Sequence, residues 1–240
     1  MASIGEKLNV VKDRVAAACA RAGRNMAEVR IVAVTKTVGV HTIRDLISLG
    51  VNDIGENRVQ DAARKAEELF GSAADLAAQD RGHLHRGAVT LHLIGHLQTN
   101  KAAQAVRIFD VIHSVDSLRL AEAVSRAAVA QKKVMPVLLE VNISGEESKF
   151  GFQPEDAFDA SPHIAALPGL RLDGLMTMAP LGADEPIIRS AFRGVRELAA
   201  RISARHQLTL PHLSMGMSQD YELAIAEGAT LLRIGTAIVG

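Results

Sequence analysis

The sequence predicts an α/β protein that forms a single (β/α)8 TIM-type barrel with an extra N-terminal helix. Eight short apolar runs alternate strictly with helical patterns along the chain, and such alternation implies parallel strands joined by crossover helices. The length of 240 residues suits eight units of this kind. The runner-up is an open doubly wound sheet, which is weakened because no GxGxxG motif follows the first run.

We expect one domain over residues 1–240, which begins with a helix inside residues 1–25. Ser3 suits the N-cap of this helix. Cys19 falls on the apolar stripe, and a small buried side chain is the better interpretation than a reactive thiol. The stripe recurs at helical spacing and consists of Ile4, Leu8, Val11, Val15, Ala18 and Cys19.

The remaining elements follow in order. The expected strands are residues 31–34, 52–54, 91–94, 109–113, 135–141, 172–176, 212–214 and 231–234. The expected helices are residues 41–49, 57–69, 98–106, 117–131, 154–166, 186–206 and 219–227. Residues 71–90 break the alternation because they are rich in Gly, Ala and charge without a period, so we expect a mobile surface insertion there.

Composition excludes several classes of protein. Lys plus Arg and Asp plus Glu both number 27, so the chain lacks the basic excess of a general nucleic-acid binder. Cys19 is the only cysteine, which excludes an internal disulfide and fits a reduced, cytoplasmic setting. No apolar run reaches the length of a membrane span, and the N-terminus does not read as a signal peptide.

Three histidines, His83, His85 and His92, alternate near the insertion. No carboxylate or cysteine pattern accompanies them, so we expect exposed loop histidines rather than a metal site.

Polar residues gather where the expected strands end, which is where barrels place their function. Lys36 follows the first run, and an amine there can be partly desolvated, which lowers its pKa and prepares it to attack an aldehyde. The alternative is a surface lysine that ends a strand. The loops SMGMS and GTA offer glycine N–H groups and the hydroxyls of Ser214 and Thr236 to a phosphate.

Arg233 lies inside the last apolar run, LLRIG, and a buried arginine must meet an acceptor. A ring nitrogen of a bound cofactor would serve, and a buried carboxylate is the alternative. Tyr221, the only tyrosine, begins an expected helix, where a packing role is the better interpretation than a catalytic base.

Seven strings run in order from about residue 30 to the C-terminus: AVTKT, IGENRVQ, LHLIGHLQTNK, VNISGEESKFGF, GLMTMAP, LSMGMSQDYELAIAEG and RIGTAIVG. Together they resemble the pyridoxal phosphate homeostasis proteins, the YggS/PROSC-like family, whose barrel is similar to the N-terminal barrel of alanine racemase. The resemblance implies a cytoplasmic protein that binds pyridoxal 5′-phosphate (PLP) and influences vitamin B6 and amino-acid balance without a well-established catalytic reaction.

The resemblance also implies roles for individual residues. Lys36 matches the Schiff-base lysine, and Arg233 matches the residue that faces the pyridine nitrogen, where it keeps the ring a poor electron sink. Asn57 matches an asparagine near the ring. Lys149 matches a family lysine near the fifth strand, with a solvated loop cation as the equal alternative. The phosphate positions are Ser214, Gly216, Gly235 and Thr236, and the pocket-lining positions are His92, Gly95, His96 and Met176.

Three functions stay open at this point. We favour a non-catalytic PLP carrier, a monomer or weak dimer, with PLP-dependent apoenzymes as candidate recipients. The second is a PLP-dependent racemase or decarboxylase, which is disfavoured because the chain ends directly after the last expected strand, without a second domain to supply a tyrosine base. The third is a barrel enzyme without PLP, in which Lys36 forms a Schiff base with a sugar phosphate.

Overall fold

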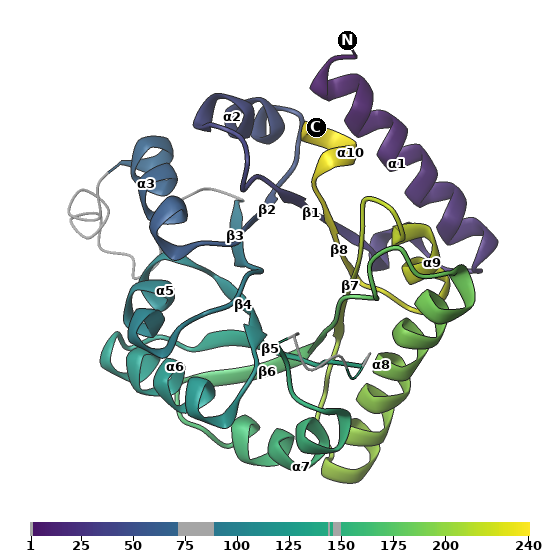
Figure 1. Ribbon diagram of the computed structural model, residues 1–240. Coiled ribbons are helices and arrows are strands. Elements are labelled where there is room, and N and C mark those ends of the chain that lie inside the picture. The colour runs from purple at the N-terminus through teal and green to yellow at the C-terminus, as the bar shows by residue number, and fades with distance from the viewer. Residues whose placement is uncertain (1, 72–88, 144, 146–149) are drawn as a thin grey trace.

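The computed structural model describes residues 2–71, 89–143, 145 and 150–240, and it contains a closed barrel of eight parallel strands (Figure 1). The strands follow one another around the barrel in sequence order, and β8 closes it against β1. The expected (β/α)8 barrel is thereby confirmed. The strands are β1 Arg30–Val34, β2 Asp53–Glu56, β3 Thr90–Leu93, β4 Val111–Val115, β5 Met135–Glu140, β6 Leu170–Met176, β7 His212–Met217 and β8 Leu231–Ile234.

The helices surround the barrel as an outer ring (Figure 1). They are α1 Ile4–Arg21, α2 Val40–Ser48, α3 Val59–Phe70, α5 Ala102–Ile108, α6 Leu118–Ala130, α7 Pro154–Ala165, α8 Glu185–His206, α9 Tyr221–Ala226 and α10 Thr236–Val239, with short 3-10 turns at Met26–Glu28 and Thr99–Lys101. Helix α10 was not predicted from the sequence. Its single turn forms because the N–H groups of Ile238 and Val239 both reach the carbonyl of Gly235.

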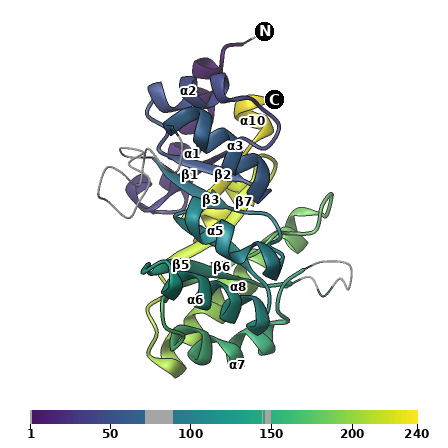
Figure 2. The same cartoon turned by 90° about the vertical axis from the view of Figure 1, so that its left-hand side faces the viewer.

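The extra N-terminal helix α1 begins with a reciprocal cap. Ser3 Oγ accepts a hydrogen bond of 3.2 Å from Glu6 N, and Glu6 Oε2 accepts one of 2.7 Å from Ser3 N, so two otherwise unpaired N–H groups are satisfied. The apolar stripe of α1, Cys19 included, is buried as expected, except that Ile4 at the start of the helix is half-buried. The helix packs on α9 and α10, and the two chain ends lie close together in both views (Figures 1 and 2), where Lys7 Nζ donates to the carbonyl of Gly240.

Two apolar clusters lie on opposite sides of the barrel wall, one outside it and one inside. Ala33 belongs to the large cluster that packs under the helices, while its neighbour Val32 belongs to a small cluster with Leu138, Met176 and Leu231. Because successive strand residues point to opposite faces, the small cluster lies inside the barrel. Many of the other buried residues of the interior are polar, whereas barrels of this kind are usually filled by branched apolar side chains. These buried polar residues include His92, His113, Glu140, Ser214 and Arg233.

Most expected boundaries lie within a few residues of the observed ones. The largest differences are at α5, which begins at Ala102 rather than residue 98, and at β7, which runs to Met217 rather than residue 214. Most of the expected insertion, residues 72–88, and Lys149 lie outside the described residues. Among the described residues, no helix is both long and apolar enough to cross a membrane.

Candidate functional site

Lys36 lies where the sequence placed it, at the carboxyl end of the first strand. Strand β1 ends at Val34, and Thr35 is fully buried, with its backbone N–H bonded to the carbonyl of Gly55 at 3.0 Å. The chain then turns, and Lys36 is exposed. The expected strand-end position is therefore confirmed. The expected partial desolvation of Lys36 is not, because the described protein atoms leave this side chain open to solvent.

A buried ion pair anchors the turn that carries Lys36. Lys65 Nζ, from α3, lies 2.7 Å from Glu56 Oε1 and donates a second bond of 2.7 Å to the carbonyl of Thr35. Thr35 Oγ1 donates to the same Glu56 oxygen at 2.6 Å. The second oxygen, Glu56 Oε2, is buried without a hydrogen-bond partner among the described residues. Breaking such a pair leaves an uncompensated buried charge, so the turn is held rigidly.

The loops after β2 and β3 are in direct contact. Asn57 follows β2 directly. A Cβ added to Gly95 would stand 2.4 Å from the carbonyl oxygen of Asn57. Ser114 Oγ donates to the carbonyl of Gly95 at 2.7 Å and fixes this approach from β4. From the sequence, Asn57 was expected near the ring and Gly95 in the pocket lining, and the structure brings the two together because only glycine leaves room for the neighbouring backbone.

His96 lies further out on the same rim and is exposed. Its Nδ1 is 2.9 Å from Asp116 Oδ2, and its ring stacks on Phe150 with 3.8 Å between the ring centroids. Asp116 follows β4 and Phe150 follows the loop after β5, so His96 links three rim segments.

Arg233 is buried inside the barrel on β8, and it has acceptors, as its sequence context demanded. Nη1 donates to Ser214 Oγ at 2.6 Å, and Nη2 donates to the carbonyl of Thr177 at 2.8 Å. These direct partners are a hydroxyl and a carbonyl rather than the carboxylate of the alternative. Burial lowers the pKa of Arg233 to about 10, although Glu140 and Asp220 oppose the change.

Glu140 belongs to the same interior and was missed by the sequence analysis. It is the last residue of β5 and only 5% exposed. Burial and the neighbouring Asp116 raise its pKa to about 7, against the opposing charge of Arg233. The available signal was an acidic residue that ends the otherwise apolar run MPVLLE. A carboxyl that titrates near neutrality at the carboxyl end of a barrel is a feature of functional sites.

The proposed phosphate loops meet through a serine that the sequence analysis did not single out. Ser218 Oγ accepts hydrogen bonds of 3.2 Å from the N–H groups of both Gly235 and Ala237. Thr236 lies between those two residues and is exposed. The two N–H groups thus converge on one oxygen, which is the arrangement that an anion needs.

Ser214 and Gly216, expected at this loop, are buried instead. Ser214 is fully buried inside the barrel with Arg233. Gly216 has φ +91°, and a Cβ there would stand 2.6 Å from Ala224, so this glycine is required by the packing of α9. Tyr221 is buried in the core as the first residue of α9, which confirms its expected packing position.

Two further expectations need correction or closer placement. His92 is not an exposed loop residue: it is buried on β3, with Nε2 2.8 Å from Asp53 Oδ1 and Nδ1 2.9 Å from His113 Nε2. Met176 ends β6 and packs in the small inner cluster, with Glu140 and Ser214 as its neighbours on β5 and β7. Within the described part of the chain, no group of side chains has the make-up of a metal site.

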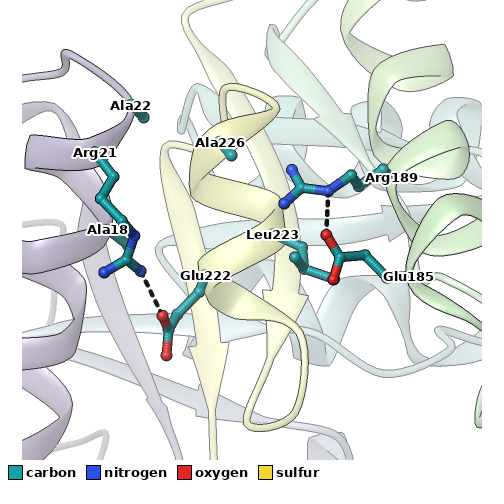
Figure 3. A pocket seen from close by; sticks show the side chains of 8 residues that line it. All are labelled: Ala18, Arg21, Ala22, Glu185, Arg189, Glu222, Leu223 and Ala226. Atoms are coloured by element: carbon teal, nitrogen blue, oxygen red, sulfur yellow. Dashed lines mark hydrogen bonds and ion pairs between the residues drawn. The ribbon is translucent and has the colours of Figure 1, made fainter.

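A surface cavity of about 320 Å³ lies elsewhere, between α1, α8 and α9 (Figure 3). Its charged residues pair with one another: Arg21 Nη2 is 2.6 Å from Glu222 Oε2, and Arg189 Nε is 2.7 Å from Glu185 Oε1. Because these charges are already paired with one another, they are not available to bind a charged ligand. We therefore place the candidate site at the carboxyl end of the barrel, with Lys36, Arg233, Glu140 and the Ser218 loop.

The fold and this site define a barrel of the type found in alanine racemase, and the family model "Alanine racemase, N-terminal domain" matches residues 8–240. Proteins named "Pyridoxal phosphate homeostasis protein" are 38% identical in Aquifex aeolicus, over 98% of this chain and 96% of that one, and 39% identical in Pseudomonas aeruginosa, over 100% and 96%. The chain therefore belongs to the pyridoxal phosphate homeostasis protein family. A solved structure of PipY from Synechococcus elongatus, with PLP bound, is 35% identical with a TM-score of 0.81, over 99% of this chain and 100% of that one.

Proposed function

We propose that this protein binds PLP at the carboxyl end of its barrel, with the Lys36 amine joined to the aldehyde as a Schiff base, and acts in intracellular PLP homeostasis. The observation that carries the proposal is the placement of an exposed lysine amine, a buried arginine and a pair of convergent N–H groups around one barrel end. Membership of the family and the PLP bound to PipY support the same conclusion.

The residues present fit the chemical groups of PLP. When bound, PLP supplies an aldehyde that condenses with amines and a ring that can accept electrons. Lys36 offers an amine at the first strand end. The N–H groups of Gly235 and Ala237, together with Ser218 and Thr236, offer donors for the phosphate. Asn57 and Met176 are proposed beside the ring, whereas His92 acts from inside the barrel rather than at its rim.

We further propose that the protein holds PLP without catalytic turnover of its own. Arg233 is the proposed neighbour of the pyridine nitrogen, and a cation there disfavours protonation of the ring and so weakens its electron-accepting power. Tyr221, the only tyrosine, is buried in the packing of α9 and is not offered to the site. PLP-dependent apoenzymes are the proposed recipients, in the cytoplasm.

Two measurements test these proposals. Borohydride reduction of the PLP-loaded protein, followed by peptide mass spectrometry, should place the adduct on Lys36; an adduct on another lysine would refute the assignment. The loaded protein should leave amino acids unchanged, as measured by racemisation and decarboxylation assays. Arg233→Glu should favour the protonated ring and introduce slow transamination, provided that circular dichroism shows a folded variant, because reversal of a buried charge can unfold a barrel.

A further inference from the structure

The interior of the barrel contains a continuous chain of hydrogen bonds that ends on Arg233. Asp53 Oδ1 lies 2.8 Å from His92 Nε2, and His92 Nδ1 lies 2.9 Å from His113 Nε2. His113 Nδ1 lies 2.9 Å from Ser214 Oγ, which accepts from Arg233 Nη1 at 2.6 Å. The chain starts at the first residue of β2 and crosses the barrel to the next-to-last residue of β8.

When both imidazoles are neutral, the number of available protons allows all hydrogen bonds in this series to point in only one direction. A neutral imidazole carries a single N–H, and an ionised carboxylate only accepts. His92 Nε2 must therefore carry the proton that faces Asp53, which leaves Nδ1 to accept from His113 Nε2. His113 Nδ1 then accepts the hydroxyl proton of Ser214. Every hydrogen bond points toward Asp53, and Ser214 Oγ offers only lone pairs to Arg233.

Asp53 is ionised in this arrangement. Burial raises its pKa, but the hydrogen bonds from His92 and Arg30 outweigh burial and hold the pKa below its ordinary value. The reverse direction would set His92 Nε2 and Asp53 Oδ1 facing each other as two acceptors, unless one further proton is present.

We propose that this hydrogen-bond chain positions Arg233 by holding the hydroxyl proton of Ser214 inside the barrel, and that uptake of one proton reverses its two inner hydrogen bonds, between Ser214 and His113 and between His113 and His92. A hydronium ion of the solvent supplies a proton to Ser214 Oγ and becomes water, while the original hydroxyl proton passes to His113 Nδ1. The Nε2 proton of His113 passes to His92 Nδ1. Each transfer breaks one bond to hydrogen and forms another, and the positive charge comes to rest on His92 beside Asp53.

The charges around the chain favour this resting place. His92 is the imidazole that touches a carboxylate. Burial, followed by the charges of His92 and Arg233, holds the pKa of His113 well below its ordinary value, and His212 and Arg30 act in the same direction. Besides its own members Asp53 and Arg233, the charged or titratable groups that act on the hydrogen-bond chain are Arg30 on β1, Glu140 on β5, His212 on β7 and Asp220 after β7. Arg171 and Asp173 on β6 act on His212 rather than on the hydrogen-bond chain itself.

The consequence for the site is a change in Ser214. Before proton uptake its hydroxyl is an acceptor polarised by His113, and such chains strengthen each bond within them. After uptake it accepts from both His113 and Arg233, and its own proton needs a new acceptor. Ser214, His113 and His92 are thus positioning residues that act on a bound molecule through Arg233. The protein without ligand suffices for the test, so its outcome is independent of the proposed function.

Nitrogen-15 NMR of histidine-labelled protein reads the direction of the chain, because two-bond proton–nitrogen spectra distinguish the two neutral tautomers. At about pH 8, His92 and His113 should both carry their proton on Nε2. On acidification of the folded protein, His92 should gain its second proton. His113 should move its proton to Nδ1 at the same midpoint. His92→Gln and His113→Gln serve only to assign the resonances.

Three results would overturn the proposal: a proton on His113 Nδ1 at about pH 8, a second proton on His92 that leaves the His113 tautomer unchanged, or no such step before acid unfolds the protein. Asp53→Asn adds a second test. Its amide oxygen still accepts from His92, but without the negative charge the shared midpoint should fall by roughly 1 to 3 pH units. Asp173→Asn removes a carboxylate at β6 that is bonded to Arg171, and should leave the midpoint close to that of the wild type. Equal shifts in both variants would also refute the proposal.

Discussion

Arg233 Nη1 donates a hydrogen bond of 2.6 Å to Ser214 Oγ, and this bond joins the arginine of β8 to the hydroxyl of β7 inside the barrel. Nη2 of the same guanidinium donates to Thr177, just beyond β6. The planar group is therefore held on two sides, and its orientation is set before any molecule enters the site. Substitutions at Ser214 are expected to act through Arg233 rather than by direct contact with a ligand.

Lys36→Ala should abolish the borohydride-reducible PLP adduct and leave weaker, non-covalent binding, because the phosphate donors remain. Lys36→Arg is the matched control: it keeps the charge and should also lose the adduct. The free energy of unfolding of both variants should lie within about 0.5 kcal/mol of the wild-type value, since the Lys36 side chain is exposed. Mass spectrometry after reduction measures the adduct, and urea unfolding measures stability. Full adduct occupancy in Lys36→Ala would contradict the prediction.

Ser218→Ala should weaken PLP binding through the phosphate. The loss of one hydrogen bond to a charged group costs about 1.5–3 kcal/mol, which is roughly a tenfold to hundredfold rise in Kd. Thr236→Val should act in the same direction. The affinity for pyridoxal, which lacks the phosphate, should change little in either variant, and fluorescence titration with both ligands makes the comparison.

Ser214→Ala is the matched control for Ser218→Ala. Its effect should be equal for PLP and pyridoxal, because Ser214 is bonded to Arg233 and not to the phosphate loop. If Ser214→Ala instead weakened binding of PLP alone, Ser214 would contact the phosphate, as the sequence predicted.

The difference between the two serines shows how far sequence reasoning reaches. The alternation of apolar runs and helices predicted the barrel, and charged residues at apolar strands pointed to Lys36 and Arg233. The string SMGMS does not tell which serine reaches the loop. That depends on β7 running on to Met217, on a register shift against β8 between Ser214 and Met217, and on the positive φ of Gly216.

The polar interior was the other part that the sequence left open. His113 and Glu140 were visible as polar residues in apolar runs, but strand ends need polar residues in any case. Their significance comes from contacts across the barrel, between residues as far apart in sequence as His113 and Ser214. One sequence without structure does not supply such pairings.

Gly95→Ala should destabilise the protein and disturb the loop that carries Asn57. The added methyl group would stand 2.4 Å from the carbonyl oxygen of Asn57, and relief of such an overlap costs about 1–3 kcal/mol. Gly5→Ala is the control: a Cβ there meets Leu49 at 3.8 Å, an ordinary contact, and alanine in a helix gains about 0.5–1 kcal/mol over glycine. Urea unfolding should show opposite signs, and two changes of the same sign would refute the argument.

Glu140→Gln should change how stability depends on pH. The pKa of Glu140 is raised from 4.5 to about 7, first by burial and then by Asp116. Below pH 4.5 the carboxyl is protonated in the folded and unfolded chains alike. Between pH 4.5 and about 7 the unfolded chain loses this proton first, so the folded protein binds more protons and its stability falls as pH rises.

The wild type should therefore lose up to roughly 3 kcal/mol across this window through Glu140, and the neutral glutamine should remove that loss. Urea unfolding at several pH values measures the difference, which should grow from pH 4.5 and level off above about 7. Glu155→Gln is the control, because Glu155 is exposed and its ion pair with Arg201 lowers its pKa rather than raising it. The stability of Glu155→Gln relative to the wild type should therefore not increase as pH rises. Parallel profiles for Glu140→Gln and the wild type would show that Glu140 is ionised in the folded protein without cost, and that Arg233 fully compensates its charge.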